Sequence, residues 1–158
     1  MKTTAPLPVF RFKIDFFVAT AKGSNKGQNK PVCSGAFSEC SGIEATMEPK
    51  AIKVGGMNQG EIQLAGRTNY STVILKRGIS LTRDMWNWFN LVSGGAYAYR
   101  LDAEIMLMNF ADQDGEYALK WQLKNCLPTK FKTADLNATS TQIGVEELHL
   151  VHEGLSHE

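Results

Sequence analysis

The stretch TVILKRGIS, residues 72–80, decides how the chain folds. Its first four residues form a short apolar run rich in β-branched side chains, which predicts a buried strand. The run ends on Lys76, Arg77 and Gly78, and a helical pattern begins directly afterwards. Gly78 permits a sharp turn, while the long side chains of Lys76 and Arg77 can extend past the core. The sequence therefore predicts a core strand that enters a helix through a charged corner.

Composition places the chain among ordinary soluble globular domains. Of its 158 residues 43% are hydrophobic and 21% charged, and no apolar run approaches the ~18 residues of a membrane span. A formal net charge of +1 provides no overall field to attract nucleic acid or anionic lipid. Pro6 and Pro8 interrupt the segment where a signal peptide would need an apolar core. We expect one domain, 1–158, with no export signal, no membrane binding of its own and no specific nucleic-acid recognition.

β patterns dominate both ends of the chain. Residues 9–19 and 117–123 alternate apolar and polar side chains, which predicts two half-buried strands. The β pattern resumes at residue 99, and the segments 99–110 and 116–126 flank Asp114-Gly115, a hairpin-turn signal. The polar stretches 21–31 and 127–141 are expected to be an exposed loop and a connection.

The last strand, within residues 142–153, changes the parity of its apolar residues. Ile143 and Val145 fall on one parity, whereas Leu148 and Leu150 fall on the other. Such a slip is what a β-bulge produces, so the sequence predicts a bulge at Glu146-Glu147.

One helix is expected, at about residues 81–93. Its apolar residues recur at helical spacing, Ser80 or Thr82 can cap its start, and Gly94-Gly95 can end it. Trp86 and Trp88 are assigned to the core. The face that should pack consists of Met85, Trp88, Phe89, Leu91 and Val92.

A hairpin arm is expected at about residues 46–66. It is rich in glycine and polar groups, and a hairpin of this kind cannot bury enough surface to be stable alone in water. Two interpretations stay open: a flexible surface hairpin, or an arm that becomes ordered by packing on another subunit. With six or seven strands and one helix, the expected fold is mainly β, an antiparallel β-barrel or two-sheet sandwich with a docked helix.

Signals for catalysis or cofactor binding are weak. Cys33, Cys40 and Cys126 match neither a disulfide framework nor a paired zinc site, so reduced thiols are expected. His149 and His152 have opposite parity on a strand and should not share a metal. The glycine pairs lack the context of a phosphate-binding loop. We therefore expect no enzyme, no metal and no cofactor.

The order of these features resembles the tail-tube protein family of contractile phages and phage-like extracellular contractile injection systems. The resemblance covers nearly the whole chain. It rests on a proline-flanked first strand (6–16), a Ser-Gly step at 41–42, the LKRG motif before the helix, Trp86 in the helix, NCLP at 125–128, NATS at 137–140 and the Glu146-Glu147 strand.

This resemblance implies hexameric rings that stack into a hollow tube within a contractile sheath. The partners would be other copies of the chain, sheath and baseplate proteins, and effector or DNA cargo in the lumen. Such a protein would be made in the bacterial cytoplasm and assembled into a phage-tail-like particle. An arm too polar to stand alone could then be held by neighbouring subunits, and we expect 50–64 to contact one across rings. Lys76 and Arg77 could be solvated charges at a strand end, or they could pair with Glu146 or Glu147 at a subunit or ring boundary. The predicted interface residues are Lys50, Ile52, Val54, Met57, Gln59, Ile62, Leu64, Lys76, Arg77, Glu146 and Glu147.

Other functions remain open at this level. The loop at 21–31 could face the sheath or baseplate, which leaves both a repeating tube subunit and a tube-initiator ring of the baseplate as candidates. A ring-former of the type VI secretion kind is a related alternative. A monomeric ligand-binding β-barrel is the candidate from another class.

Overall fold

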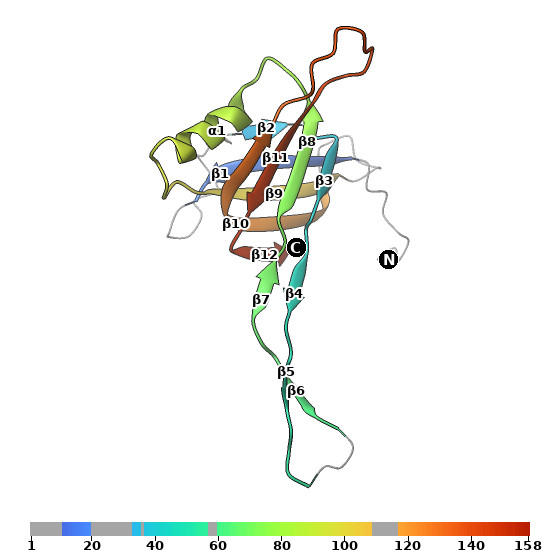
Figure 1. The fold of residues 1–158 in the computed structure, drawn as a ribbon, viewed down its shortest axis with the longest axis vertical. Helices are drawn as coiled ribbons and strands as arrows, with labels where there is room; N and C mark the ends of the chain where they lie inside the picture. The colour runs from blue at the N-terminus through green and yellow to red at the C-terminus, as the bar shows by residue number, and fades with distance from the viewer. Residues whose placement is uncertain (1–10, 20–32, 36, 57–59, 109–116) are drawn as a thin grey trace.

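The main sheet accounts for most of the chain, with one helix against it and a long arm leaving it (Figure 1). The computed structural model describes residues 11–19, 33–35, 37–56, 60–108 and 117–158. Within them lie twelve strands, more than the six or seven expected, and one helix: β1 Phe12–Val18, β2 Cys33–Gly35, β3 Glu39–Ser41, β4 Ala45–Met47, β5 Lys50–Ile52, β6 Ile62–Leu64, β7 Thr68–Tyr70, β8 Val73–Gly78, α1 Asp84–Ser93, β9 Leu101–Met108, β10 Tyr117–Lys132, β11 Val145–Val151 and β12 Gly154–His157.

Strand β10 joins two layers of the antiparallel sheet. The strand order is β2-β1-β9-β10-β11-β8-β3, and β12 pairs with β10 beside this path. The first half of β10 pairs with β9 and β12, whereas its second half pairs with β11. Between the halves, Asn125 has φ 52° and the register with β9 shifts between Leu123 and Cys126. This irregularity turns the strand from one layer into the other, and the expected barrel or two-sheet sandwich is confirmed.

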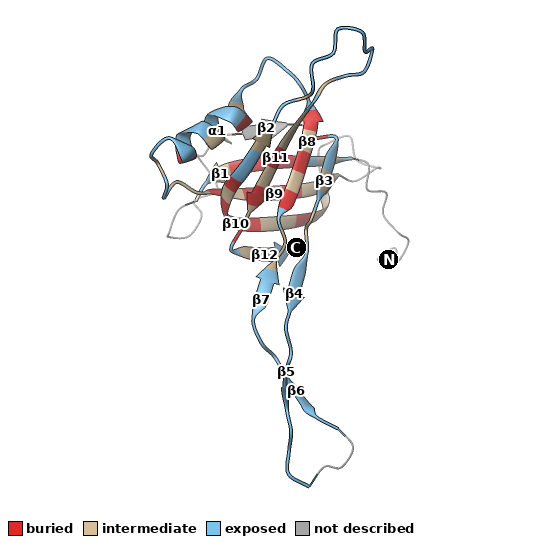
Figure 2. Cartoon of the chain, viewed as in Figure 1, coloured by how far each residue is buried: buried red, intermediate tan, exposed pale blue. Residues whose placement is uncertain are grey.

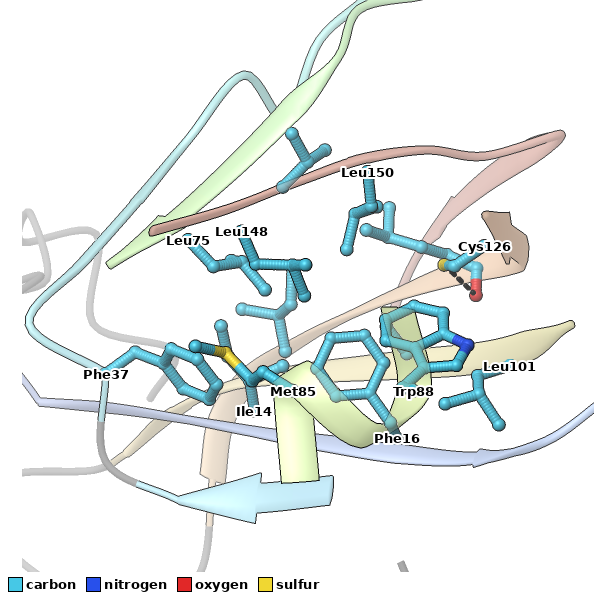
Figure 3. Packing of buried hydrophobic residues seen from close by; sticks show 14 of the residues in the cluster. Ile14, Phe16, Phe37, Leu75, Met85, Trp88, Leu101, Cys126, Leu148 and Leu150 are labelled. Atoms are coloured by element: carbon cyan, nitrogen blue, oxygen red, sulfur yellow. Dashed lines mark hydrogen bonds between the residues drawn. The ribbon is translucent and has the colours of Figure 1, made fainter. Parts of the chain in front are cut away.

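The core lies between the two layers and under the helix. Alternate residues of β1, β8, β9 and β11 point into it, as period-2 strands require. Helix α1 adds Met85, Trp88 and Val92, and the Trp88 ring lies 5.2 Å from that of Phe16 (Figure 3). The decisive run 72–80 is therefore a core strand: Val73 and Leu75 are buried, and β8 is flanked by β11 and β3.

Helix α1 begins three residues later than the expected position 81. Arg83 precedes its first turn without a side-chain cap, while the Ser80 hydroxyl oxygen accepts a hydrogen bond from the Thr82 amide. The assignment of both tryptophans to the core is correct for Trp88 and wrong for Trp86, which is 44% exposed and packs on Phe89 and Phe131 at the surface. Leu91, expected on the packed face, is also exposed.

The predicted bulge at Glu146-Glu147 is wrong. β11 pairs with β8 without a shift from Val145 to Leu150, and the irregularity lies on the partner strand β10, between Pro128 and Lys130. Proline has no amide hydrogen to donate to a ladder, so an irregularity beside it has a physical cause. The apparent parity change arose because Ile143 precedes the strand and is exposed.

The connecting segments expected from the sequence differ in part from the structure. The connection expected at 127–141 is shorter, because β10 continues to Lys132 and pairs with β11 over this stretch. The loop at 21–31 and the turn at Asp114-Gly115 lie outside the described residues.

The helix in the described part of the chain is neither long enough nor apolar enough to cross a membrane.

Candidate assembly surfaces

The arm is longer than expected and stands away from the main sheet. β4 pairs with β7 and β5 pairs with β6, so the paired region spans 45–70 instead of 46–66. These two pairs form two-stranded sheets of their own, separate from the main sheet. Figure 2 shows the arm exposed along its described length. A hairpin that extends this far without covering an apolar core needs contacts from elsewhere to hold its shape.

One face of the arm is apolar. Ile52 lies opposite Ile62, and Leu64 lies opposite Lys50, so these four side chains share a face. Ile62 and Leu64 are each 44% exposed and Ile52 is 40% exposed, while Val54, which follows, is also 40% exposed. Ala51 and Gln63 occupy the other face. We call the surface of Ile52, Ile62 and Leu64 the arm face. Two other predicted interface residues, Met57 and Gln59, lie outside the described residues.

Glycines bring the two sides of the arm root close together. Gly42 has φ +86°, and a Cβ at this position would lie 2.1 Å from the Thr72 carbonyl oxygen. A Cβ at Gly66 would lie 1.9 Å from the Glu48 carbonyl oxygen. Only glycine permits such close backbone approaches, so the two sides of the arm come together at these positions.

The charged corner of the decisive run is buried inside the subunit. Arg77 is 6% exposed and faces the core side of β8, where its Nε donates to Glu146 at 3.3 Å and its guanidinium pairs with Asp84. It also lies over the Phe37 ring, 5.7 Å from the centroid. Glu146 is one of the two carboxylates that the sequence offers as partners of Lys76 or Arg77, and the Arg77–Glu146 pair forms within one chain. Whether either residue reaches a subunit boundary stays a prediction.

Sequence reasoning missed Asp84 as the second partner. A signal existed, since Asp84 lies seven residues after Arg77 and begins the helix, where an acidic side chain is favourable. The other two predicted corner residues pair separately at the surface: Lys76 with Glu39 at 3.4 Å, and Glu147 with His149. The hydrogen bond from His149 holds the pKa of Glu147 below its usual value.

No metal-binding cluster occurs in the described ranges. Their His, Cys, Asp and Glu side chains form no group of three that could hold a metal ion. His152 is buried, its ring lies 4.9 Å from that of Tyr70 at the arm root, and burial lowers its pKa. Burial raises the pKa of the Cys40 and Cys126 thiols to about 12, which keeps them protonated and unreactive at neutral pH.

Several solved structures share the fold of this chain. A chain of the anti-feeding prophage baseplate, determined with 6-fold symmetry, is 24% identical with a TM-score of 0.78, covering 99% of this chain and 97% of that one. A chain of the sheath–tube complex of the extracellular contractile injection system PVC is 22% identical with a TM-score of 0.74, covering 98% and 93%. Hcp1 from Flavobacterium johnsoniae is 10% identical with a TM-score of 0.52, covering 91% and 93%.

Sequence comparison identifies the family. No curated protein sequence matches the chain. The family of the T4-like virus tail tube protein gp19, however, matches residues 8–156, nearly the full length. Its members are structural tail tube proteins, not enzymes. The chain therefore belongs to the T4-like tail tube protein gp19 family.

Proposed function

We propose that the protein is a repeating subunit of the inner tube of a contractile injection system or phage tail, in which hexameric rings stack to form a conduit for cargo. The observation that carries the proposal is the arm, whose apolar face is left exposed by the described residues of its own chain. Because the chain belongs to a tail tube family, we take a neighbouring copy of the chain as the partner of the arm.

The energetics of the arm favour an assembled state. Isolated two-stranded hairpins are at best marginally stable in water, and this one adds four exposed aliphatic side chains. Contact with another subunit would remove apolar surface from water, at roughly 25 cal/mol per Å². Lys50, Ile52, Val54, Ile62 and Leu64 are therefore the interface residues we propose from the arm.

The edges of the main sheet provide a second means of assembly. β2 and β3 lie at the two ends of the strand order, and each is only three residues long. Exposed edges can pair with strands of another chain, each backbone hydrogen bond contributing a net ~0.5–1.5 kcal/mol. Closure into a ring would cover such edges, and the small contributions of the individual hydrogen bonds would add up over all the subunits.

The proposed partners follow from this role. They are other copies of the chain within and between rings, together with sheath and baseplate proteins outside the tube and effector or DNA cargo inside it. The particle would be assembled in the cytoplasm of the producing bacterium. Among the corner residues, Lys76 and Glu147 are the better candidates for intersubunit contact, because their side chains are 35% and 24% exposed. Those of Arg77 and Glu146 are only 7% and 12% exposed.

A tube-initiator ring of the baseplate is the second candidate. It is favoured by one observation: the TM-score is higher with the anti-feeding prophage baseplate chain, at 0.78, than with the sheath–tube chain, at 0.74. An initiator would form rings of the same kind and would not extend them into a long tube by itself.

Negative-stain electron microscopy of the purified protein, together with its solution mass, tests the proposal. Six-fold rings that stack into tubes are the expected result. Single rings that never extend would favour the initiator, and a monomer at high concentration would overturn both. The variant Ile62→Asp should abolish stacking, whereas Gln63→Asp, which places the same charge on the opposite face of the arm, should stack like the parent protein.

A further inference from the structure

A buried histidine lies where the arm leaves the main sheet. His152 comes directly after β11 and is 8% exposed, and its ring lies 4.9 Å from the ring of Tyr70. Figure 1 shows β7 beside the turn that leads from β11 into β12. Tyr70 is the last residue of β7 and lies opposite Ala45 in β4. The contact between the two rings therefore joins the base of the arm to the body of the subunit.

The two nitrogens of the His152 ring have unequal environments. Nδ1 lies 3.0 Å from the Gly154 carbonyl oxygen, which can only accept, so the hydrogen of the neutral ring is assigned to Nδ1. Nε2 is buried and has no hydrogen-bond partner among the described residues. Protonation would turn Nε2 into a charged donor without an acceptor, which is costly in a buried position. Burial accordingly lowers the pKa of His152, and the Gly154 hydrogen bond offsets this only in part.

The charged groups of the neighbouring segments do not compensate the ring. The titratable side chains there are Tyr70 from β7, the exposed Glu44 before β4, Asp102 from β9, Lys124 from β10 and Glu153 from the turn itself. Asn125 already donates to Glu153 at 2.7 Å and to Asp102 at 3.0 Å. Burial and the backbone hydrogen bond are the causes of the shifted pKa of His152, and no carboxylate is among them.

We propose that His152 is an acid-sensitive latch for the arm: the neutral ring holds Tyr70 at the base of the arm, and protonation releases it. This inference concerns a single subunit and goes beyond the proposed function. Once released into water, the ring would bind the proton with its ordinary pKa of 6.5. The latch is therefore closed above this pH and opens as the pH falls through it, because the open state gains a proton that the closed state resists.

Local opening of the arm is the expected response, because the arm contributes nothing to the core. Residues 45–56 and 60–69 are all exposed, so release of Tyr70 leaves the buried cluster intact. At neutral pH the latch would keep the arm in one orientation relative to the body. A pre-oriented arm has less conformational freedom to lose on contact with another molecule, and mild acid would remove this advantage.

Hydrogen exchange measured by mass spectrometry tests the latch directly. The reporting amides are those of the β4–β7 pair and of Ser71, which donates to the Glu44 carbonyl at 3.2 Å. Exchange is compared at about pH 7.5, 6.5 and 5.5 at a concentration where the solution mass shows no stacked rings, and is expressed as protection factors to remove its intrinsic dependence on pH. Protection of these amides should fall up to about tenfold across this range, the limit for one group with an ordinary pKa of 6.5. Residues 101–108 of the main sheet are the internal reference and should keep their protection.

Two variants remove the titration while each keeps one contact of the ring. His152→Phe retains an aromatic ring beside Tyr70, and His152→Asn retains a donor for the Gly154 carbonyl. In both variants the protection of the arm root should be independent of pH over this range. His149→Asn is the matched control, since His149 lies on the same strand and pairs with Glu147 near the surface, and it should respond to pH like the parent protein.

The outcomes that overturn the inference are distinct. Constant protection of the arm root in the parent protein would show that no latch opens. A pH response that persists in both His152 variants would assign it to another group. Equal loss of protection in residues 101–108 would show general unfolding instead of release of the arm. None of these results bears on whether rings form and stack, so the proposed function stands or falls on microscopy alone.

Discussion

Replacement of Arg77 by Met should destabilise the subunit by about 3–5 kcal/mol, because it leaves buried carboxylates without their cation. The side chains of Asp84 and Glu146 are only 14% and 12% exposed, and that of Arg77 is 7% exposed. A loss of this size is a large fraction of the ~5–15 kcal/mol stability of a typical domain. Lys76→Met is the matched control: it lies next along the strand, and its pair with Glu39 is solvent-exposed, so it should cost below about 1 kcal/mol.

Urea unfolding monitored by tryptophan fluorescence measures both changes, since Trp88 is buried in the core. All proteins are compared at one concentration, because assembly adds to apparent stability. The triple variant Arg77→Met, Asp84→Asn, Glu146→Gln separates the causes: with no unpaired charge left behind, it should recover most of the lost stability. If Arg77→Met costs no more than Lys76→Met, the buried charges do not govern this corner and the reasoning is refuted.

Three further predictions concern the arm root and the core. Gly42→Ala should lower the free energy of unfolding by about 1–3 kcal/mol in the same urea assay, because φ is +86° and the new Cβ would meet the Thr72 carbonyl. Gly55→Ala, with open space around it, should be nearly neutral. Burial lowers the pKa of His152 in the folded state, whereas the unfolded chain binds the proton at the ordinary pKa, so stability should fall as pH drops below 6.5. His152→Phe should flatten this dependence of stability on pH. An unchanged slope would contradict the assignment. Cys126, with its pKa raised to about 12, should resist a thiol reagent in native protein at pH 8 and react quickly in denaturant; rapid native labelling would show the site to be open.

Sequence alone determined the features that depend on local pattern. Alternation identified the half-buried strand β1, helical spacing located α1 to within three residues of its start, and the low apolar content of 46–66 identified the arm. Each of these signals depends on neighbouring residues, so a single sequence contains it. The order of motifs also indicated the family, which the match over 8–156 shows.

Tertiary structure alone decided the rest, because it depends on which distant segments meet. Arg77 has the sequence context of a solvated charge at a strand end, and only the pairing of β8 with β11 and the position of α1 bury it between Glu146 and Asp84. The irregularity expected in β11 belongs to its partner β10, and strand parity cannot distinguish which of two paired strands is irregular. Exposed Ile79 and Ile143 are likewise brought together at one end of the sheet, where the Ile79 amide donates to the Gly144 carbonyl. Local periodicity specifies elements, whereas the burial of a charge and the exposure of an apolar surface follow from how those elements pack.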